Sequence, residues 1–151
     1  MPATATIRTA RSADLEPMAN LLKMLFSIET DFSADRSRQL TGLRMLMGNP
    51  RARILVADHG GEVVGMCTGQ IVISTAEGGP SILVEDVVVR EDFQNRGIGR
   101  LLMQGLYEFA EENRATRLQL LADCDNQPAL NFYEKTGWGK TKMICLRRKN
   151  S

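Results

Sequence analysis

Residues 84–100 read Val-Glu-Asp-Val-Val-Val-Arg-Glu-Asp-Phe-Gln-Asn-Arg-Gly-Ile-Gly-Arg, and an apolar stripe follows them from Leu101 to Phe109. The valines are typical of a buried strand, the polar residues after them of a short loop, and the glycines of a turn that opens a helix. Backbone N–H groups and the positive end of the helix macrodipole meet at such a turn, and together they favour an anion. The stretch therefore predicts a site for a phosphate-bearing ligand.

The spacing of the glycines narrows this prediction. Gln94-x-x-Gly97-x-Gly99 differs from the G-x-G-x-x-G pattern of dinucleotide-binding folds, and the sequence lacks the G-x-x-x-x-G-K-[ST] loop of nucleotide hydrolases. The spacing resembles the pyrophosphate loop Q/R-x-x-G-x-G/A of the GNAT superfamily of N-acetyltransferases. Downstream, at about the spacing of that family, lies Asn126-x-x-Ala129-x-x-Phe132-Tyr133-x-x-x-Gly137-Trp138. The resemblance extends from Ile82 to Trp138 and implies an acetyl-coenzyme A (acetyl-CoA)-dependent acyltransferase.

The same resemblance implies an α/β (α+β) fold with a mixed, mostly antiparallel central sheet and helices on both faces. A chain of 151 residues with 43% hydrophobic content suits one globular domain. We therefore expect residues 1–151 to form a single N-acetyltransferase domain.

Hydrophobic periodicity predicts the element order β-α-α-β-β-β-α-β-α-β. Strands are expected at residues 4–9, 53–58, 62–74, 81–90, 117–122 and 141–147. Helices are expected after capping side chains at residues 12–14, over residues 40–47, after Gly97 and after Asn126. Gly48-Asn49-Pro50 should end the second helix in a left-handed cap, and residues 58–61 suit a hairpin turn. The strands on either side of the helix after Gly97 should run parallel. In the family that the chain resembles, the first two helices line the acceptor side of the cleft.

Charge and cysteine content argue against several other functions. The formal net charge is +1 with the two signs interspersed, so the sequence lacks the basic face that nucleic-acid binding needs. Cys67, Cys124 and Cys145 are odd in number and lack C-x-x-C spacing, which argues against a disulfide framework or a metal site. The sequence shows neither an apolar leader nor an apolar run of about 18 residues. We expect a cytoplasmic protein with neither nucleic-acid nor membrane partners.

The loop after the valine strand offers the donors that would hold coenzyme A. The amides of Asn95, Arg96, Gly97, Ile98, Gly99 and Arg100 can donate to its two phosphates. The side chains of Gln94 and Arg96 can add to this binding. The family resemblance further implies that the strand bulges at Val87, Val88 and Val89. Their backbone groups would then pair with the pantetheine arm and stabilise negative charge on the thioester oxygen.

The attacking amine needs a proton acceptor, because a primary amine with a pKa of about 10 is almost wholly protonated at neutral pH. Glu85 is the candidate base, directly or through water, and Asp86 is the reserve. A structural ion pair with an arginine is the alternative for either carboxylate. Strict strand alternation would put Glu85 on the face of Val87 and Val89, whereas a bulge would shift that phase.

The resemblance implies a general acid for the departing thiolate. Tyr133 matches the tyrosine that has this role in the family, and a core aromatic with a satisfied hydroxyl is the alternative. Asn126 can bind the pantetheine amide, cap the following helix, or do both. An acyl-enzyme intermediate on Cys124 is disfavoured, because no base is recognisable beside it.

Together these features predict an N-acetyltransferase that transfers acetyl from acetyl-CoA to an amine by direct attack in a ternary complex. The alternative is a non-catalytic acyl-CoA-binding or sensor module, which would not need Glu85 and Tyr133. The acceptor is expected to be a small-molecule or peptide amine. Glu29, Asp31 and Asp35 offer negative charge to a cationic, polyamine-like acceptor, or they solvate a loop. Proteins of the resembled family are often dimers, but nothing in this sequence identifies a homodimer interface.

Overall fold

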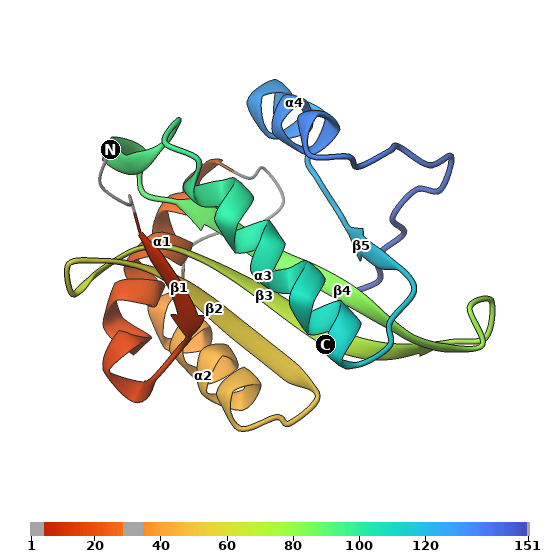
Figure 1. Ribbon diagram of the computed structural model, residues 1–151, viewed down its shortest axis with the longest axis horizontal. Helices are drawn as coiled ribbons and strands as arrows, with labels where there is room; N and C mark the ends of the chain where they lie inside the picture. The colour runs from red at the N-terminus through yellow and green to blue at the C-terminus, as the bar shows by residue number, and fades with distance from the viewer. Residues whose placement is uncertain (1–4, 29–34, 151) are drawn as a thin grey trace. The chain divides into compact units, whose positions relative to one another are not determined.

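The computed structural model describes residues 5–28 and 35–150 (Figure 1). The elements, in chain order, are β1 (Thr6–Thr9), the 3₁₀ turn η1 (Ser12–Asp14), α1 (Leu15–Ile28), α2 (Arg36–Met47), β2 (Ala52–His59), β3 (Glu62–Ser74), β4 (Gly79–Val89), the 3₁₀ turn η2 (Glu91–Phe93), α3 (Ile98–Glu112), β5 (Leu118–Leu120) and α4 (Gln127–Lys135). The chain falls into two compact units, Met1–Leu120 and Leu121–Ser151. The first unit contains the strands and α1 to α3, and the second contains α4.

The strands form one sheet in the order β1-β2-β3-β4-β5. Neighbours from β1 to β4 are antiparallel, and β4 and β5 are parallel because α3 connects them. Gly60 and Gly61 have φ angles of 58° and 91°, and Asp58 Oδ1 accepts a hydrogen bond from the Gly61 amide at 2.7 Å. These positive angles close the β2–β3 hairpin where the sequence predicted it. The predicted mixed, mostly antiparallel sheet is confirmed.

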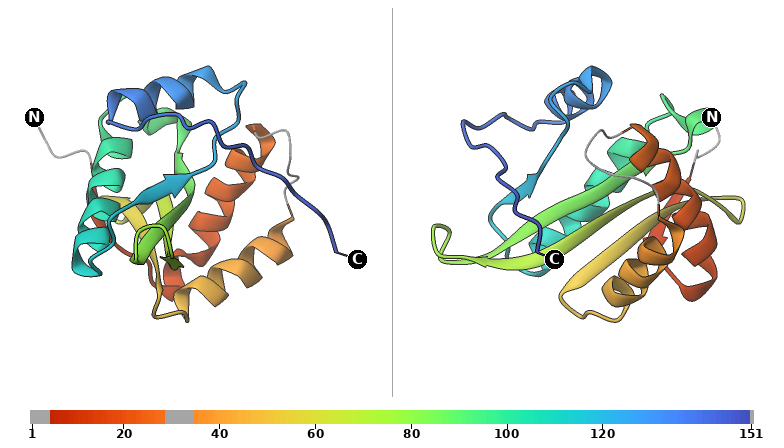
Figure 2. Two further views of the ribbon diagram at one scale, coloured as in Figure 1. Left: turned by 90° about the vertical axis from the view of Figure 1, so that its right-hand side faces the viewer. Right: turned by 180° about the vertical axis from the view of Figure 1, so that it is seen from behind.

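Helices cover both faces of the sheet, as predicted (Figures 1 and 2). On one face, α1 and α2 contribute Met18, Leu22 and Leu43 to a buried cluster with Met66 and Val88 of the sheet. Helix α3 covers the other face with its own buried stripe, which includes Leu102, Leu106 and Phe109. Helices α1, α2 and α3 therefore bury residues of the apolar stripes that their sequence periodicity predicted.

Two glycines of β3 let α3 lie close to the sheet. A Cβ at Gly65 would lie 3.2 Å from the Val88 carbonyl oxygen and 3.3 Å from Leu102 Cδ1. A Cβ at Gly69 would lie 3.0 Å from Leu106 Cδ2. Because these distances are tighter than ordinary van der Waals contact, larger side chains here would push α3 away from β3 and β4.

An ion-pair network joins β1, β2 and the start of α1. Arg8 donates to both carboxylate oxygens of Asp14, at 2.8 and 3.0 Å, and to Asp58 Oδ2 at 3.0 Å. Asp14 also accepts from the Arg11 amide at 2.7 Å, so it caps the turn η1. Asp14 is only 4% exposed, and the hydrogen bonds from Arg8 hold its pKa below the usual range.

Two local predictions are wrong. The strand predicted at residues 141–147 is not formed, and residues 141–150 contain no helix or strand. Its apolar residues Met143, Ile144 and Leu146 are at least 80% exposed, which shows that β propensity without a partner strand does not make a strand. Gly48 ends α2 with a right-handed φ of −85°, and its amide donates to the Arg44 carbonyl at 3.1 Å, so the predicted left-handed cap is absent there.

The predicted bounds of the other elements agree with the structure to within a few residues, although residue 4 of the first strand lies outside the described residues. Within the described ranges, none of the helices is long and apolar enough to cross a membrane.

We expect Asp14→Asn to lower the free energy of unfolding by about 3 kcal/mol, because it leaves the Arg8 guanidinium without its buried anion. The matched control is Glu16→Gln, which breaks the exposed Arg36–Glu16 pair and should cost less than about 1 kcal/mol. Urea denaturation of both variants at pH 7 measures the difference. Equal losses in the two variants would contradict the buried role of Asp14.

The same network predicts a pH dependence. Because the folded-state pKa of Asp14 is lowered, its stabilisation is present above the unfolded value of about 3.9 and is lost as the pH falls through the folded value. The wild-type protein should therefore lose stability on acidification below about pH 4 more steeply than Asp14→Asn does. Urea titrations between pH 7 and pH 2 test this, and parallel pH curves for the two proteins would contradict it.

Candidate functional site

Between Glu85 and Val88, β4 has one residue more than the β3 segment with which it pairs. The pairing runs from Thr68 opposite Glu85 directly to Met66 opposite Val88, so two residues of β4 stand against Cys67 alone. Asp86, in the extra stretch, has a left-handed φ of 56°. This arrangement is a β-bulge, which agrees with the expectation taken from the family resemblance.

The edge of β4 that faces away from β3 is paired only over part of its length. Its parallel pairing with β5 covers Ile82 to Val84 and stops there. On the β3 side, the Arg90 amide donates to the Val64 carbonyl at 2.7 Å. Because successive residues of a strand direct their backbone groups to opposite sides, the amides of Val87 and Val89 face the unpaired edge. We call residues 85–89 of this edge the open edge.

The turn after β4 leads back past the open edge into α3. Gln94 Nε2 donates to the Val89 carbonyl at 2.9 Å, so its side chain holds the turn against β4. Asn95 and Gly97 have left-handed φ angles of 63° and 82°, and Gly97 is the N-cap of α3. Two left-handed residues so close together turn successive amides toward one side, as in an anion-binding nest.

Among the described residues, the first amides of α3 donate no hydrogen bonds. The helix ladder begins with Leu101, whose amide donates to the Gly97 carbonyl at 3.1 Å. Within the described part of the chain, the amides of Ile98, Gly99 and Arg100 have no hydrogen-bond acceptor. Orphan N–H groups at the positive end of a 15-residue helix form a strong site for an anion.

The side chains around this helix start differ in their contacts. The Arg96 guanidinium lies over the Phe93 ring at 4.7 Å, and Arg100 is exposed beside the orphan amides. Arg90 is held by Asp92 and Glu62 in ion pairs. The charge of Arg100 therefore lies next to the amides, whereas Arg90 is already neutralised by its acidic partners.

The bulge decides which face the two carboxylates occupy. Glu85 stands opposite Thr68 and Val88 stands opposite Met66, so Glu85 shares the face of Val88, which α1 and α2 cover. The alternation that would put Glu85 with Val87 and Val89 therefore does not hold, because the bulge shifts the phase by one residue. Glu85 is exposed, whereas Asp86 is partly buried and its Oδ2 lies 3.2 Å from the Thr68 hydroxyl.

The acids predicted for acceptor binding are only partly described. Glu29 and Asp31 lie outside the described residues. Asp35 is the N-cap of α2, and its side chain accepts a hydrogen bond from the Arg38 amide at 3.1 Å. Its first task is thus to cap the start of α2, whatever charge it also offers.

The second unit carries the remaining predicted residues. Asn126 is the N-cap of α4 and accepts from the Ala129 amide at 3.2 Å, which confirms its capping role. Tyr133 is half-buried, and its ring packs against Phe132 and Trp138 with centroid distances of 5.3 and 5.9 Å. The Trp138 amide donates to the Tyr133 carbonyl at 2.9 Å, so the turn after α4 fixes this aromatic cluster.

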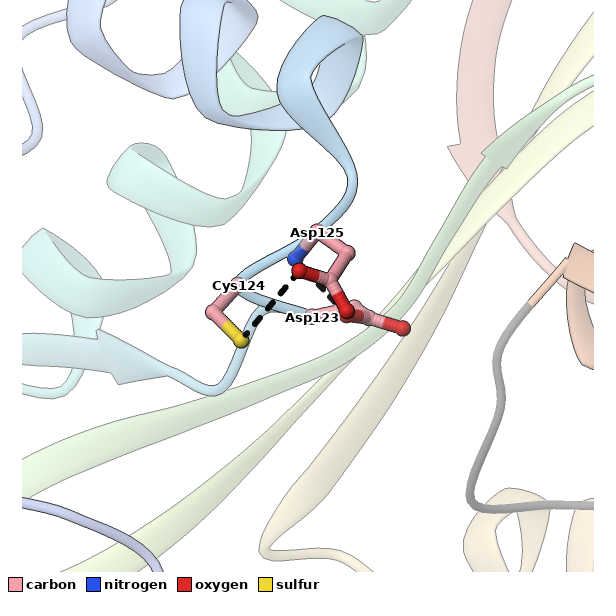
Figure 3. Close-up of side chains that lie close together, drawn as sticks. All are labelled: Asp123, Cys124 and Asp125. Atoms are coloured by element: carbon pink, nitrogen blue, oxygen red, sulfur yellow. Dashed lines mark hydrogen bonds between the residues drawn. The ribbon is translucent and has the colours of Figure 1, made fainter.

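Just before α4, three potential metal ligands meet in one turn (Figure 3). Asp123, Cys124 and Asp125 bring ligand atoms within 4.8 Å of one another. The Asp125 amide donates to Asp123 Oδ1 at 2.9 Å, and Cys124 Sγ lies 3.9 Å from Asp125 Oδ1. These contacts are those of an ordinary polar turn. Cys124 is exposed, and its nearest polar partner here is a carboxylate and not a histidine base.

Thr68 is a residue of this site that no sequence motif indicated. It is 1% exposed, and its hydroxyl lies 3.1 Å from the Glu85 carbonyl oxygen as well as 3.2 Å from Asp86. A threonine in a strand-forming run carries no sequence signal of such a contact, because the contact depends on the register of β3 against β4.

Comparison with known proteins gives one family match and several relatives. Residues 15–138 match the family described as "Acetyltransferase (GNAT) family". A streptothricin acetyltransferase of Streptomyces lavendulae is 26% identical over 155 residues, which cover 89% of this chain and 82% of the relative.

Solved structures show the same fold. A putative acetyltransferase from Agrobacterium tumefaciens str. C58 superimposes with a TM-score of 0.82 at 24% identity, over 95% of this chain and 99% of its own. The aminoglycoside N-acetyltransferase AAC(6')-Iy, in complex with CoA, gives a TM-score of 0.83 at 17% identity, over 100% of this chain and 99% of its own.

We expect Gly97→Ala to lower the free energy of unfolding by about 1 kcal/mol, because only glycine adopts a φ of 82° without strain. The added Cβ meets nothing within 4 Å, so backbone strain is the sole cause. The matched control is Gly42→Ala in α2, where a Cβ also meets nothing within 4 Å. There the helical backbone should instead give a gain of about 0.5–1 kcal/mol. Changes of the same sign in urea denaturation would contradict this account.

Proposed function

We propose how the site works from a premise that the family match supplies: the chain belongs to the acetyltransferase (GNAT) family. It is an acetyl-CoA-dependent N-acetyltransferase, which transfers acetyl from acetyl-CoA to an amine. The fold and the reaction predicted from the sequence are thereby confirmed. The residues that carry the reaction are our proposal, and one observation supports it above all. Unused amides at the start of α3 lie next to an unpaired edge of β4.

The start of α3 holds the diphosphate of coenzyme A in this proposal. The orphan amides of Ile98, Gly99 and Arg100 donate to the phosphate oxygens, and the amides of the nest at Asn95 and Gly97 extend the same surface. The Arg100 side chain adds a charged donor. Gln94 acts differently from the sequence prediction, because its amide group holds the turn on the Val89 carbonyl and so shapes the loop.

The open edge of β4 holds the pantetheine arm. An extended ligand can pair with the backbone groups of Val87 and Val89 in the way that an added strand would. An amide at this edge then donates to the thioester oxygen as negative charge develops there, an effect often worth about 3 kcal/mol per donor. The side chain of Val88 is buried in the core and its backbone groups face β3, so in this proposal Val88 supports the edge and does not contact the carrier itself.

Proton transfer is assigned to two side chains. Glu85 removes a proton from the incoming ammonium group, directly or through water, and its exposure on the α1/α2 face suits this task. Tyr133 of α4 gives a proton or a hydrogen bond to the departing thiolate. Asn126 contributes through its cap, which sets the direction of the first turn of α4.

The acceptor is a small cationic amine in this proposal. Its support comes from relatives named for streptothricin and aminoglycosides, and from the exposed carboxylate of Glu85 on the acceptor face. A peptide amine remains the less supported acceptor. We also propose a cytoplasmic location, because Cys67, Cys124 and Cys145 are all free thiols.

We expect Glu85→Gln and Tyr133→Phe each to lower kcat by about 10²-fold or more, because each removes a proton-transfer group. The affinity for acetyl-CoA should stay nearly unchanged, since neither side chain is assigned to cofactor binding. Steady-state kinetics with calorimetric titration of acetyl-CoA measure both quantities. The matched control is Glu108→Gln, an exposed carboxylate on α3, which should behave as the wild type. Unchanged turnover in both test variants would defeat the role assignment.

We expect small polycationic amines to be acetylated when a panel of amines is screened. The measured quantity is the release of the coenzyme A thiol from acetyl-CoA. The panel includes streptothricin, aminoglycosides, polyamines, amino acids and a peptide with a free N-terminus. Calorimetric titration of acetyl-CoA runs alongside. Binding of acetyl-CoA with no acetylated product from any amine would instead favour the acyl-CoA-binding or sensor module. Turnover confined to the peptide would contradict the small-amine proposal.

A further inference from the structure

We propose that Thr68 and Asp86 form a clamp that fixes the bulge of β4 and thereby aims the amides of Val87 and Val89 at the bound thioester carrier. In this role both are positioning residues and neither exchanges protons with the substrates. The inference rests on the proposed function of the open edge and assigns to Asp86 a task different from that of a reserve base.

The contacts that define the clamp join β3 to the first part of the bulge. The Thr68 hydroxyl lies 3.1 Å from the Glu85 carbonyl oxygen and 3.2 Å from Asp86 Oδ2. A hydroxyl has one proton, so it donates to these two acceptors in turn or shares its proton between them. Thr68 is 1% exposed, which means that water cannot replace this donor.

Asp86 needs an anchor because its backbone is strained. Its φ of 56° lies in the left-handed region, which most side chains avoid and which aspartate tolerates better than most. Glycine would adopt this angle at no cost, but it would provide no carboxylate for Thr68. Aspartate both tolerates the left-handed backbone and provides the carboxylate that contacts the Thr68 hydroxyl.

The opposite side of the bulge is fixed as well. Cys67 is the β3 residue that stands against the two residues of the bulge, and it is fully buried with Sγ 3.8 Å from the Leu102 carbonyl oxygen of α3. Burial, with a smaller effect of the nearby Asp86 charge, raises the pKa of the Cys67 thiol, so it stays neutral packing material. The bulge is therefore held between α3 on one face and the Thr68 hydroxyl on the other.

The bulge sets the direction of the open-edge groups. One extra residue restores Val88 to the buried cluster beneath α1 and α2 and directs the Val87 and Val89 amides away from β3. If the bulge were lost while Glu85 stayed opposite Thr68, the phase of the following residues would reverse, and the amides facing the ligand would become those of Val88 and Arg90. The clamp thus controls which donors the thioester meets.

Four substitutions distinguish a positioning role of Asp86 from a role as a catalytic base. Asp86→Asn keeps an acceptor for the Thr68 hydroxyl and tolerates the left-handed backbone, but it cannot take up a proton at pH 7. Thr68→Ser keeps the hydroxyl. Thr68→Val and Asp86→Ala each remove one partner. Thr116→Val is the control, because its hydroxyl makes a similar bond to Glu77 at the far end of β4.

We expect Thr68→Val and Asp86→Ala to weaken acetyl-CoA binding and to lower kcat, each by about tenfold, as the hydrogen bond is lost and the left-handed residue is released. Thr68→Ser, Asp86→Asn and Thr116→Val should stay within about twofold of the wild type, because they keep the clamp. The double variant Thr68→Val/Asp86→Ala should be no worse than either single variant. Calorimetric titration, steady-state kinetics and circular dichroism of each folded variant give these values.

Two outcomes would overturn the clamp. The first is wild-type acetyl-CoA affinity in both Thr68→Val and Asp86→Ala. The second is an Asp86→Asn variant as slow as Asp86→Ala, which would make the carboxylate a proton acceptor. If the wild type itself bound no acetyl-CoA, the proposed function would fail separately. The crystal structure of Thr68→Val would then decide the clamp, since an unchanged register with Asp86 still left-handed would overturn it.

Discussion

The edge of β4 that faces away from β3 has no partner strand beyond Val84 among the described residues. The rest of the site depends on this open edge. A strand inside a sheet normally exchanges hydrogen bonds with a neighbour on each side, because an unsatisfied buried N–H or C=O group costs about 1–3 kcal/mol. β4 keeps its partner β3 as far as Val89 but leaves β5 at Val84. The chain therefore keeps polar backbone groups available at its centre, where water or an extended ligand can satisfy them.

The position of the anion site follows from core packing. Helix α3 buries Leu102, Leu106 and Phe109 against the sheet, and Gly65 and Gly69 allow it to approach β3 closely. This packing fixes the helix as a rigid body, so its first turn has a fixed place beside the end of β4. The amides that start α3 and the open edge are thus positioned by the same apolar contacts. A ligand that carries both an anion and an extended arm can use the two together.

The sequence predicted those features that local patterns determine. The order of the elements up to α4, the hairpin at Gly60 and the glycine turn at Gly97 all follow from periodicity and turn chemistry. The final strand was wrong because Met143, Ile144 and Leu146 have strand-like composition but no partner strand. Three features were not predictable from the sequence. They are the contact of Gln94 with the Val89 carbonyl, the left-handed backbone of Asp86 and the contact of the Thr68 hydroxyl with Asp86. Each depends on the register between two strands or on the path of a loop, and a local sequence pattern determines neither the register nor the path.

In the proposed reaction the acetyl carrier and the amine acceptor approach β4 from different directions. This difference explains why the sequence has a motif for the carrier and none for the acceptor. In our proposal the carrier arm lies along an edge of the sheet, in its plane, where it meets backbone groups of β4 and amides of α3. Glu85 projects from a face of the sheet, because the bulge puts it in phase with Val88, and that face belongs to α1 and α2. An amine that gives its proton to Glu85 must therefore approach from the side of these helices. Backbone binding of the carrier, as we propose it, requires particular glycines at particular positions, which fits the motif between Ile82 and Trp138. Acceptor selection by the side chains of α1 and α2, which the family resemblance implies, would require no fixed backbone shape, and this fits the lack of a comparable motif before Ile82.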